Sequence, residues 1–259
     1  MPLYYEQQGS NDNPTLVFLH GFLGNCLDWH TTIEQLKSDF HCVCIDLPGH
    51  GNSSAIDLSK VDGFANCHQL IKYCLNELNI QSFVFVGYSL GGRIALDYAR
   101  SQNDPRLKHL ILESTHLGLD NDKDKMQRYQ SDLIWAECFA TQSIEDSLYD
   151  WYDQTIFDDL SDAEKGMLIE TREDNYGVYL ANMLLATSLS HQQCARQFIA
   201  TTDLPISYCY GEKDSKFKEI ADSLPQRKNL VIQGFAGLGH NTHIKKPIIY
   251  ANNIKQILR

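Results

Sequence analysis

The sequence predicts an α/β fold with a mostly parallel central sheet flanked by helices and a helical lid inserted between strands. Short apolar runs rich in β-branched and aromatic residues recur along the chain, and helix-like segments separate most of them. This alternation is typical of a parallel sheet covered on both faces, and it stops between about residues 116 and 200. We therefore expect one domain, with a core formed by 1–115 and 200–259 and a lid formed by 116–199.

The expected elements follow from the composition of each segment. The strands are expected at 15–21, 41–47, 83–89, 107–114, 204–211 and 229–235. The core helices are expected at 29–39, 61–78, 91–102 and 247–258. The insertion has helical patterns at 121–140 and 177–200 and carries several Trp and Tyr residues. Because lids close over sites and exclude water, we expect the functional site beneath this insertion.

Composition narrows the classes of ligand. The 259 residues are 43% hydrophobic and 21% charged, as in folded globular proteins. A net charge of -11 opposes binding to nucleic acid or to anionic membranes. No run approaches the roughly 18 apolar residues of a membrane span, and the N-terminus has no leader pattern, which favours a cytosolic location. No interface pattern stands out, so a monomer or a weak homo-oligomer is expected. An anionic ligand would need local arginines to hold it.

The eight cysteines lie mostly inside apolar segments. This placement predicts small buried hydrophobic side chains in a reducing compartment. Cys42 and Cys44 form the pattern most similar to a metal site, but no histidine or cysteine pair lies at the spacing of a zinc site from them. We therefore expect no metal and no cofactor.

The stretch GYSLGGR, residues 87–93, follows a buried apolar strand and precedes a helix. A Gly-x-Ser-x-Gly pattern in this strand, turn and helix context is typical of a nucleophile elbow. Gly87 and Gly91 permit a sharp turn, and the start of the helix directs free N–H groups at the site. The pattern predicts Ser89 as a catalytic nucleophile, and the alternative is a strand-to-helix turn that is merely rich in glycine.

A base and an orienting acid are expected in the order Ser, Asp, His. Asp214 follows the strand at 204–211, and His240 follows the last strand among glycines, so both lie where sites of parallel sheets are built. Three other residues are less well placed. Asp203 precedes its strand, Asp222 lies in a solvated helical stretch, and His243 is expected to cap or line the next helix.

The loop FLHGFLGN, residues 18–25, follows the first long strand. It matches the His-Gly-aromatic loop that supplies one N–H of an oxyanion hole in enzymes with such elbows. The backbone N–H groups of Phe22 and Leu90 are the expected pair. We expect His20 to hold this loop in place, and the turn at 46–53 to be structural.

Arg93 lies four residues after Ser89 on the expected helix, which is one turn or about 6 Å along the axis and on the same face. Its guanidinium could therefore bind a carboxylate through two hydrogen bonds beside the nucleophile. The alternative is a surface salt bridge, which is common and weak.

Five segments in this order resemble the α/β-hydrolase superfamily: LHGFLGN, CIDLPGHGNS, GYSLGGR, GEKDSKF and GLGHNTH. GYSLGGR, DWYDQTIFDDL, TREDNYG and YGEKDSKF further resemble the 2-succinyl-6-hydroxy-2,4-cyclohexadiene-1-carboxylate synthase family of bacterial menaquinone biosynthesis. That resemblance implies a lyase that eliminates pyruvate from 2-succinyl-5-enolpyruvyl-6-hydroxy-3-cyclohexene-1-carboxylate. Ser89, activated by His240 and Asp214, would remove the proton α to a ketone.

The same resemblance implies that Arg93, Arg128 and Arg172 bind carboxylates of this small polycarboxylate substrate, and that Tyr88 and Trp151 line the pocket. Around Arg128 the correspondence could shift by one or two residues. Arg172 could instead form a solvated ion pair, and Trp151 could belong to the core of the lid. Two other functions remain open: a carboxylesterase or carbon–carbon bond hydrolase, which would not need three arginines, and a binding protein without catalysis.

Overall fold

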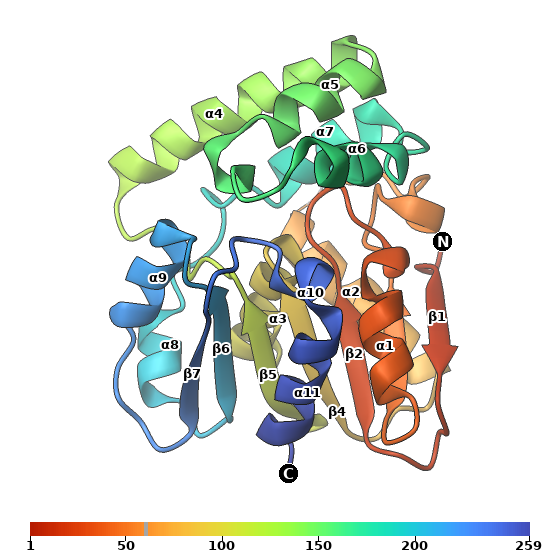
Figure 1. The fold of residues 1–259 in the computed structure, drawn as a ribbon, viewed down its shortest axis with the longest axis vertical. Helices are drawn as coiled ribbons and strands as arrows, with labels where there is room; N and C mark the ends of the chain where they lie inside the picture. The colour runs from red at the N-terminus through yellow and green to blue at the C-terminus, as the bar shows by residue number, and fades with distance from the viewer. Residues whose placement is uncertain (60–61) are drawn as a thin grey trace.

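The computed structural model describes residues 1–59 and 62–259, and its central feature is a seven-stranded sheet of order β1-β3-β2-β4-β5-β6-β7 (Figure 1). All neighbouring strands pair in parallel except β1, which runs antiparallel to β3 at one edge. The strands are β1 Tyr5–Gln8, β2 Thr15–Leu19, β3 His41–Ile45, β4 Phe83–Tyr88, β5 Leu107–Glu113, β6 Ile206–Gly211 and β7 Leu230–Phe235. The six predicted strands are confirmed, and the mostly parallel α/β architecture with them.

Alternate residues of each strand point to opposite sides of the sheet, and each side packs against its own layer of helices, so the sheet is buried on both faces. On β2, Val17 and Leu19 belong to one hydrophobic cluster, whereas Leu16 and Phe18 belong to the other. The first cluster also contains residues of four helices: α2 (Gly63–Glu77), α3 (Leu90–Gln102), α8 (Arg196–Thr201) and α9 (Ser215–Asp222). The second contains residues of α1 (His30–Leu36) and α11 (Pro247–Ile257). The sheet therefore forms the middle of three layers.

The helices of the core are α1 His30–Leu36, α2 Gly63–Glu77, α3 Leu90–Gln102, α8 Arg196–Thr201, α9 Ser215–Asp222, α10 Thr242–Lys245 and α11 Pro247–Ile257. Of these, α1, α2, α3 and α11 agree with the four segments predicted as core helices, whereas α8, α9 and α10 were not predicted as core helices. Val61, the first residue of the segment predicted at 61–78, lies outside the described residues. Short 3-10 turns at Cys26–Trp29 and Gly51–Ser53 lie in the loops that follow β2 and β3.

The insertion forms a lid, by which we mean helices α4 to α7 and the turn η3. These are α4 Asp122–Thr141, α5 Ile144–Tyr152, η3 Thr155–Phe157, α6 Asp162–Glu170 and α7 Gly177–Ala186. The lid has its own hydrophobic cluster and lies across the carboxyl ends of the strands (Figure 1). The site predicted beneath it must therefore form between these two parts.

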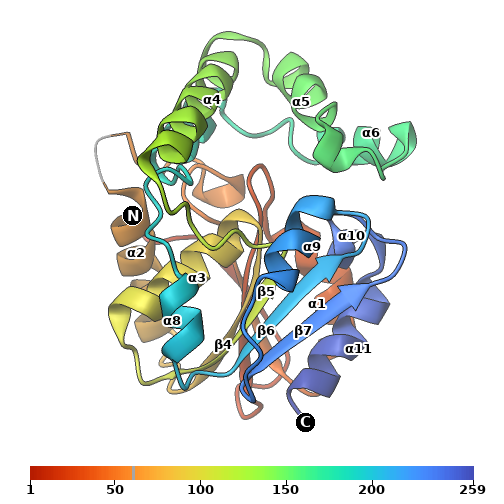
Figure 2. The same ribbon diagram turned by 90° about the vertical axis from the view of Figure 1, so that its left-hand side faces the viewer.

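The lid boundary predicted at residue 199 lies too far along the chain. Helix α8 stands beside the sheet, below the lid (Figure 2). Ala195 and Ile199 are buried in the same cluster as the core strands. A helical apolar pattern indicates a buried face but not the body against which that face packs, and for this reason the sequence alone placed the segment in the lid.

Six of the eight cysteines are buried, as their apolar surroundings predicted. Burial raises the pKa of Cys42 and of Cys67 to about 12, so both thiols stay protonated and behave as small hydrophobic groups. In residues 1–59 and 62–259, no helix combines the length and the apolar composition needed to cross a membrane.

Candidate active site

Ser89 lies between the end of β4 and the start of α3 with φ 48° and ψ -107°. Positive φ is unusual for a residue with a side chain and marks a strained turn. Glycine is required around this turn, because a Cβ at Gly91 would lie 2.3 Å from the carbonyl oxygen of Leu19. A Cβ at Gly87 would lie 2.7 Å from the Cα of Gly92. The predicted elbow is thus built by close backbone packing that only glycine allows.

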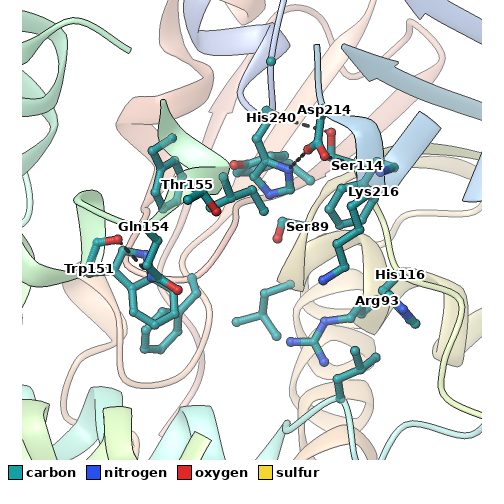
Figure 3. Close-up of a pocket in the computed structure, with 18 of the residues that line it drawn as sticks. Ser89, Arg93, Ser114, His116, Trp151, Gln154, Thr155, Asp214, Lys216 and His240 are labelled. Carbon is teal, nitrogen blue, oxygen red and sulfur yellow. Dashed lines mark hydrogen bonds and ion pairs between the residues drawn. The ribbon is translucent and has the colours of Figure 1, made fainter. Parts of the chain in front are cut away.

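Asp214 and His240 meet in the loops that follow β6 and β7. The Nδ1 atom of His240 lies 2.7 Å from Asp214 Oδ2, and both side chains are buried. The second carboxylate oxygen of Asp214 accepts the N–H of Phe217 at 3.3 Å, which fixes the carboxylate at the start of α9. The carbonyl of His240 accepts the hydroxyl of Ser114. Ser89 lies on the other side of the imidazole from Asp214 (Figure 3).

His20 holds the loop after β2 against the elbow. Its Nδ1–H donates to Gly21 O at 2.7 Å, and its Nε2 accepts the N–H of Leu47 at 2.9 Å. Burial lowers the pKa of His20, which keeps the imidazole neutral so that one nitrogen donates and the other accepts. The His20 carbonyl also accepts the N–H of Gly91 at 3.0 Å. The structural role predicted for His20 agrees with these contacts.

Phe22 and Leu90, the predicted oxyanion pair, both line the cavity in front of Ser89. Across residues 1–59 and 62–259, the hydrogen bonds of loops and helix ends leave both N–H groups without a protein acceptor. The first N–H groups of a helix have no partner within the helix, so that of Leu90 is available to an anion. Two free donors beside a strained serine are the parts of an oxyanion hole.

A cavity of about 720 Å³ separates the lid from the carboxyl ends of the strands. It brings together nine of the ten residues that the sequence singled out, namely Phe22, Tyr88, Ser89, Leu90, Arg93, Arg128, Trp151, Asp214 and His240. Trp151 faces the cavity from the lid, across from Arg93 and His116 (Figure 3). The volume is sufficient for a small organic ligand.

Arg93 extends from the first turn of α3 into this cavity. Arg93 is 8% exposed, and its Nη1 donates to the carbonyl of Thr187 at 2.7 Å. Burial, together with the charge of Arg128, lowers the pKa of Arg93 to about 9, so Arg93 is protonated at neutral pH. Asp132 is already paired with Arg128, and no carboxylate of the described residues forms an ion pair with Arg93. The surface salt bridge considered from the sequence is therefore not what the structure contains.

Arg128 reaches the cavity from α4 of the lid. Its Nε lies 2.8 Å from Asp132 Oδ1 one turn later, and its side chain is 31% exposed. Asp132 also accepts the hydroxyl of Ser188 at 2.6 Å. Because this pair occupies one edge of the guanidinium only, Arg128 retains donors that can bind an anion in the cavity.

Tyr88 and Trp151 line the cavity, as the resemblance implied. The hydroxyl of Tyr88 donates to Asn241 Oδ1 at 2.9 Å, so this ring supports the loop that carries His240. Trp151 contacts the rings of Phe22 and Trp135, and it therefore contributes to the lid core as well as to the cavity wall.

Comparison with known proteins decides the family. The family described as alpha/beta hydrolase fold matches residues 14–246. A 2-succinyl-6-hydroxy-2,4-cyclohexadiene-1-carboxylate synthase of Salmonella arizonae is 39% identical over 251 residues, which cover 97% of this chain and 96% of the relative. The Salmonella typhimurium protein of the same name is 40% identical over the same shares.

The chain belongs to the 2-succinyl-6-hydroxy-2,4-cyclohexadiene-1-carboxylate synthase family.

Solved structures agree with this assignment to the synthase family. MenH from S. aureus is 27% identical with a TM-score of 0.85, and the match covers 98% of this chain and 97% of that one. A thermophilic esterase from Thermogutta terrifontis is 20% identical with a TM-score of 0.78, covering 99% and 93%, and shares the fold. The α/β-hydrolase fold predicted from the sequence is confirmed, and so is the resemblance to the synthase family.

Arg172 is the one predicted site residue that the structure does not bring to the cavity of this synthase family member. Both oxygens of Asp28 accept hydrogen bonds from Arg172 Nη2, at 2.7 and 2.8 Å. The two side chains are 3% and 7% exposed. Although burial alone would lower the pKa of Arg172, Asp28 raises it. This placement argues against the carboxylate contact that the resemblance implied, since Asp28 already neutralises the guanidinium, and it differs equally from a solvated ion pair.

Substitution of Arg172 by methionine is expected to destabilise the protein by about 3–5 kcal/mol, because it leaves the Asp28 carboxylate unpaired and buried. The double variant Asp28→Asn, Arg172→Met should recover most of this loss. Urea unfolding followed by circular dichroism measures the free energy of unfolding of each variant. Equal stability of wild type and Arg172→Met would contradict the stabilising role of this buried pair.

The residues considered as alternatives to the triad lie elsewhere. Asp203 lines a separate groove at the opposite end of the strands, and Asp222 forms an exposed ion pair with Lys218. His243 lies inside α10, fully buried, with Nδ1 2.9 Å from Glu113. This agrees with the helix-lining role expected for His243.

Lys216 is a cavity residue that the sequence reasoning missed. It lies in the quoted segment GEKDSKF, two residues after Asp214 and in the first turn of α9. That position was the available signal, because the first turn of a helix that follows a catalytic loop faces the same cavity as the loop.

Proposed function

We propose that this protein eliminates pyruvate from 2-succinyl-5-enolpyruvyl-6-hydroxy-3-cyclohexene-1-carboxylate, giving 2-succinyl-6-hydroxy-2,4-cyclohexadiene-1-carboxylate for menaquinone biosynthesis. The observation that carries the proposal is the position of Arg93 one helical turn from Ser89, as a buried cation that has no carboxylate partner among residues 1–59 and 62–259. An enzyme that hydrolyses neutral esters does not need such a charge, whereas an enzyme that binds a polycarboxylate does. The names of the relatives at 39% and 40% identity support the same reaction.

The elimination begins with removal of the proton on C2, which is acidic because it lies α to the succinyl ketone. Asp214 orients His240, His240 takes the Ser89 hydroxyl proton, and the Ser89 oxygen removes the C2 proton. The C2–H electrons form the C2–C3 double bond, the ring double bond moves to C4–C5, and the C5–O bond breaks. The leaving group departs as the enolate of pyruvate. His240 then gives up the proton that it accepted, the enolate takes up one proton to become pyruvate, and no acyl-enzyme forms.

Negative charge develops on the ketone oxygen as the proton departs. The N–H groups of Phe22 and Leu90 are proposed to bind this oxygen, as in an oxyanion hole. The burial of Tyr88 and Leu90 on either side of Ser89 supports this role, because hydrogen bonds to a developing charge are stronger where water is excluded. The triad of a hydrolase would thus stabilise an enolate in place of a tetrahedral intermediate.

The substrate carries three carboxylates, and the chain has a net charge of -11, so binding depends on local cations. Arg93 and Arg128 are proposed to hold carboxylates, with Tyr88 and Trp151 as apolar walls. We also propose a cytosolic location and a monomer or weak homo-oligomer, without nucleic-acid or membrane partners. Eight cysteines without disulfides support a reducing compartment.

Pyruvate release is the direct test. The wild-type protein, incubated with the enolpyruvyl substrate, should release one pyruvate per substrate, measured through NADH oxidation by added lactate dehydrogenase. Formation of the cyclohexadiene should appear at the same rate in the ultraviolet spectrum, because the reaction conjugates the ring with the ketone. No pyruvate above background, together with rapid hydrolysis of p-nitrophenyl esters, would favour the carboxylesterase alternative.

A further inference from the structure

Lys216 extends from the first turn of α9 into the cavity, where its ammonium ends between Ser89 and Arg93 in the view of Figure 3. We propose that Lys216 binds a carboxylate of the substrate, and that it forms with Arg93 and Arg128 a three-cation cluster. The inference rests on the proposed function, because it takes the ligand to be a polycarboxylate. It adds a binding residue to the cavity wall opposite Trp151.

The three cations come from three separate elements. Arg93 lies on α3, Arg128 on α4 of the lid, and Lys216 on α9. A ligand that contacts all three side chains would therefore connect α4 of the lid with α3 and α9 of the core. These three residues are far apart in the sequence and come together only when the chain folds, so no local motif predicts the cluster.

The carboxylates near the cluster are already engaged. Asp214 is bonded to His240, and Asp132 is paired with Arg128 and accepts the hydroxyl of Ser188. Asp159, on the lid side, accepts the N–H of Gly239. No carboxylate among the described parts of the chain lies within ion-pair distance of the Lys216 ammonium, which lies 5.5 Å from the centre of the Phe217 ring. The cluster therefore presents more positive charge than the protein neutralises.

The positive charges of the cluster repel one another, and this repulsion lowers the pKa of the groups near them. Partial burial lowers the pKa of Lys216, and the charges of Arg128 and Arg93 lower it further, while Asp214 and Asp132 oppose the change. His116, which faces the same end of the cavity from the loop after β5, stays neutral because burial and these cations lower its pKa to about 3. An anion bound here would relieve the repulsion and favour protonated Lys216.

The test compares Lys216→Met and Lys216→Arg with the control Lys218→Met. Lys218 lies on the same helix, exposed and paired with Asp222. We expect Lys216→Met to raise the KM for the enolpyruvyl substrate about 10- to 100-fold, the usual worth of a hydrogen bond to a charged group, with little change in kcat. Lys216→Arg should restore most of the affinity, and Lys218→Met should match the wild type.

Calorimetric titration with 2-succinylbenzoate, a stable dicarboxylate analogue of the product, measures binding without turnover. A weaker Kd for Lys216→Met assigns Lys216 to a carboxylate that the product keeps. An unchanged Kd with a raised KM assigns it to the carboxylate of the enolpyruvyl group, which the analogue lacks. Kd and KM both equal to those of the wild type would overturn the inference, as would a fall in kcat with KM unchanged.

The pH dependence separates a binding role from a structural one. Only protonated Lys216 attracts a carboxylate, so its contribution to affinity is present at neutral pH and is lost as pH rises through its lowered pKa. Arg93, Arg128, His116, Asp132 and Asp214 face the same group and stay unchanged in the Lys216→Arg variant. Arginine holds its proton to higher pH, so the loss of affinity should move to higher pH in this variant.

An unmoved profile would contradict the binding role. Failure of the proposed function is distinguishable, because it appears as absence of pyruvate from the wild type, whereas calorimetry with the analogue still decides whether Lys216 binds carboxylates.

Discussion

Replacement of Ser89 by alanine is expected to lower kcat for pyruvate release at least ~1,000-fold, which is the scale that a positioned proton acceptor contributes. The serine oxygen is the atom proposed to meet the C2 proton, and the strained turn at Ser89, with φ 48°, holds this oxygen at the elbow. The residual rate should reflect binding and the oxyanion donors, which remain in the variant. Steady-state kinetics with the coupled pyruvate assay measure the change.

The double variant Ser89→Ala, His240→Ala provides the sharper result. Because Ser89 and His240 act as one unit, the double variant should lose no more activity than the more damaging single variant. Binding of 2-succinylbenzoate by Ser89→Ala, measured by calorimetry, should stay near the wild-type value and so exclude misfolding. Retention of most activity by Ser89→Ala with complete loss in His240→Ala would instead make His240 the direct base.

The residues of the proposed triad could be placed together from the sequence because each lies in a short motif at the end of a strand. The loop after β4 carries Ser89, that after β6 carries Asp214, and that after β7 carries His240. In a parallel sheet these loops meet at one edge, so chain order and strand ends suffice to place them together. No knowledge of tertiary packing is needed for this step.

Packing between distant segments explains what the sequence could not place. Arg172 has the same chemistry as Arg93, but its position depends on Asp28, which lies 144 residues earlier. Strand β1 was missed because YEQQ is short and polar, and its pairing with β3 at the sheet edge supplies the order that its composition does not. Helix α8 was placed in the lid because its apolar face does not identify its partner. Each of these positions depends on a contact between residues that are distant in the sequence, and a local sequence pattern does not predict such a contact.

The same triad can serve hydrolysis or elimination, so the charges around it determine the reaction. Structures of esterases share this fold, as the TM-score of 0.78 to the Thermogutta terrifontis protein indicates. What differs in chemical terms is the ligand that the cavity can hold. The proposed reaction requires a ligand whose carboxylates fix the C2–H bond against Ser89, and Arg93 is the cation best placed to do so.

Substitution of Arg93 by methionine should therefore have the second-largest effect on activity. Truncation of one partner of a buried, hydrogen-bonded charge pair costs about 2–5 kcal/mol, so kcat/KM is expected to fall roughly 30- to 4,000-fold. Methionine keeps much of the apolar contact with the ring of Phe64, which lies 6.0 Å from the guanidinium carbon. Arg93→Lys retains the charge without the two-pronged geometry and should lie between the wild type and Arg93→Met.

Arg196→Met is the matched control, since Arg196 is 41% exposed on α8 and is paired with Asp120 outside the cavity. Its kcat/KM should equal that of the wild type. Raising the salt concentration should increase the KM of the wild type and of Arg196→Met more than that of Arg93→Met, because the latter has lost one attractive charge. If Arg93→Met releases pyruvate as fast as the wild type at low substrate concentration, the cation beside Ser89 does not bind the reacting ligand. The charge of Arg93 would then no longer argue against an ester hydrolase.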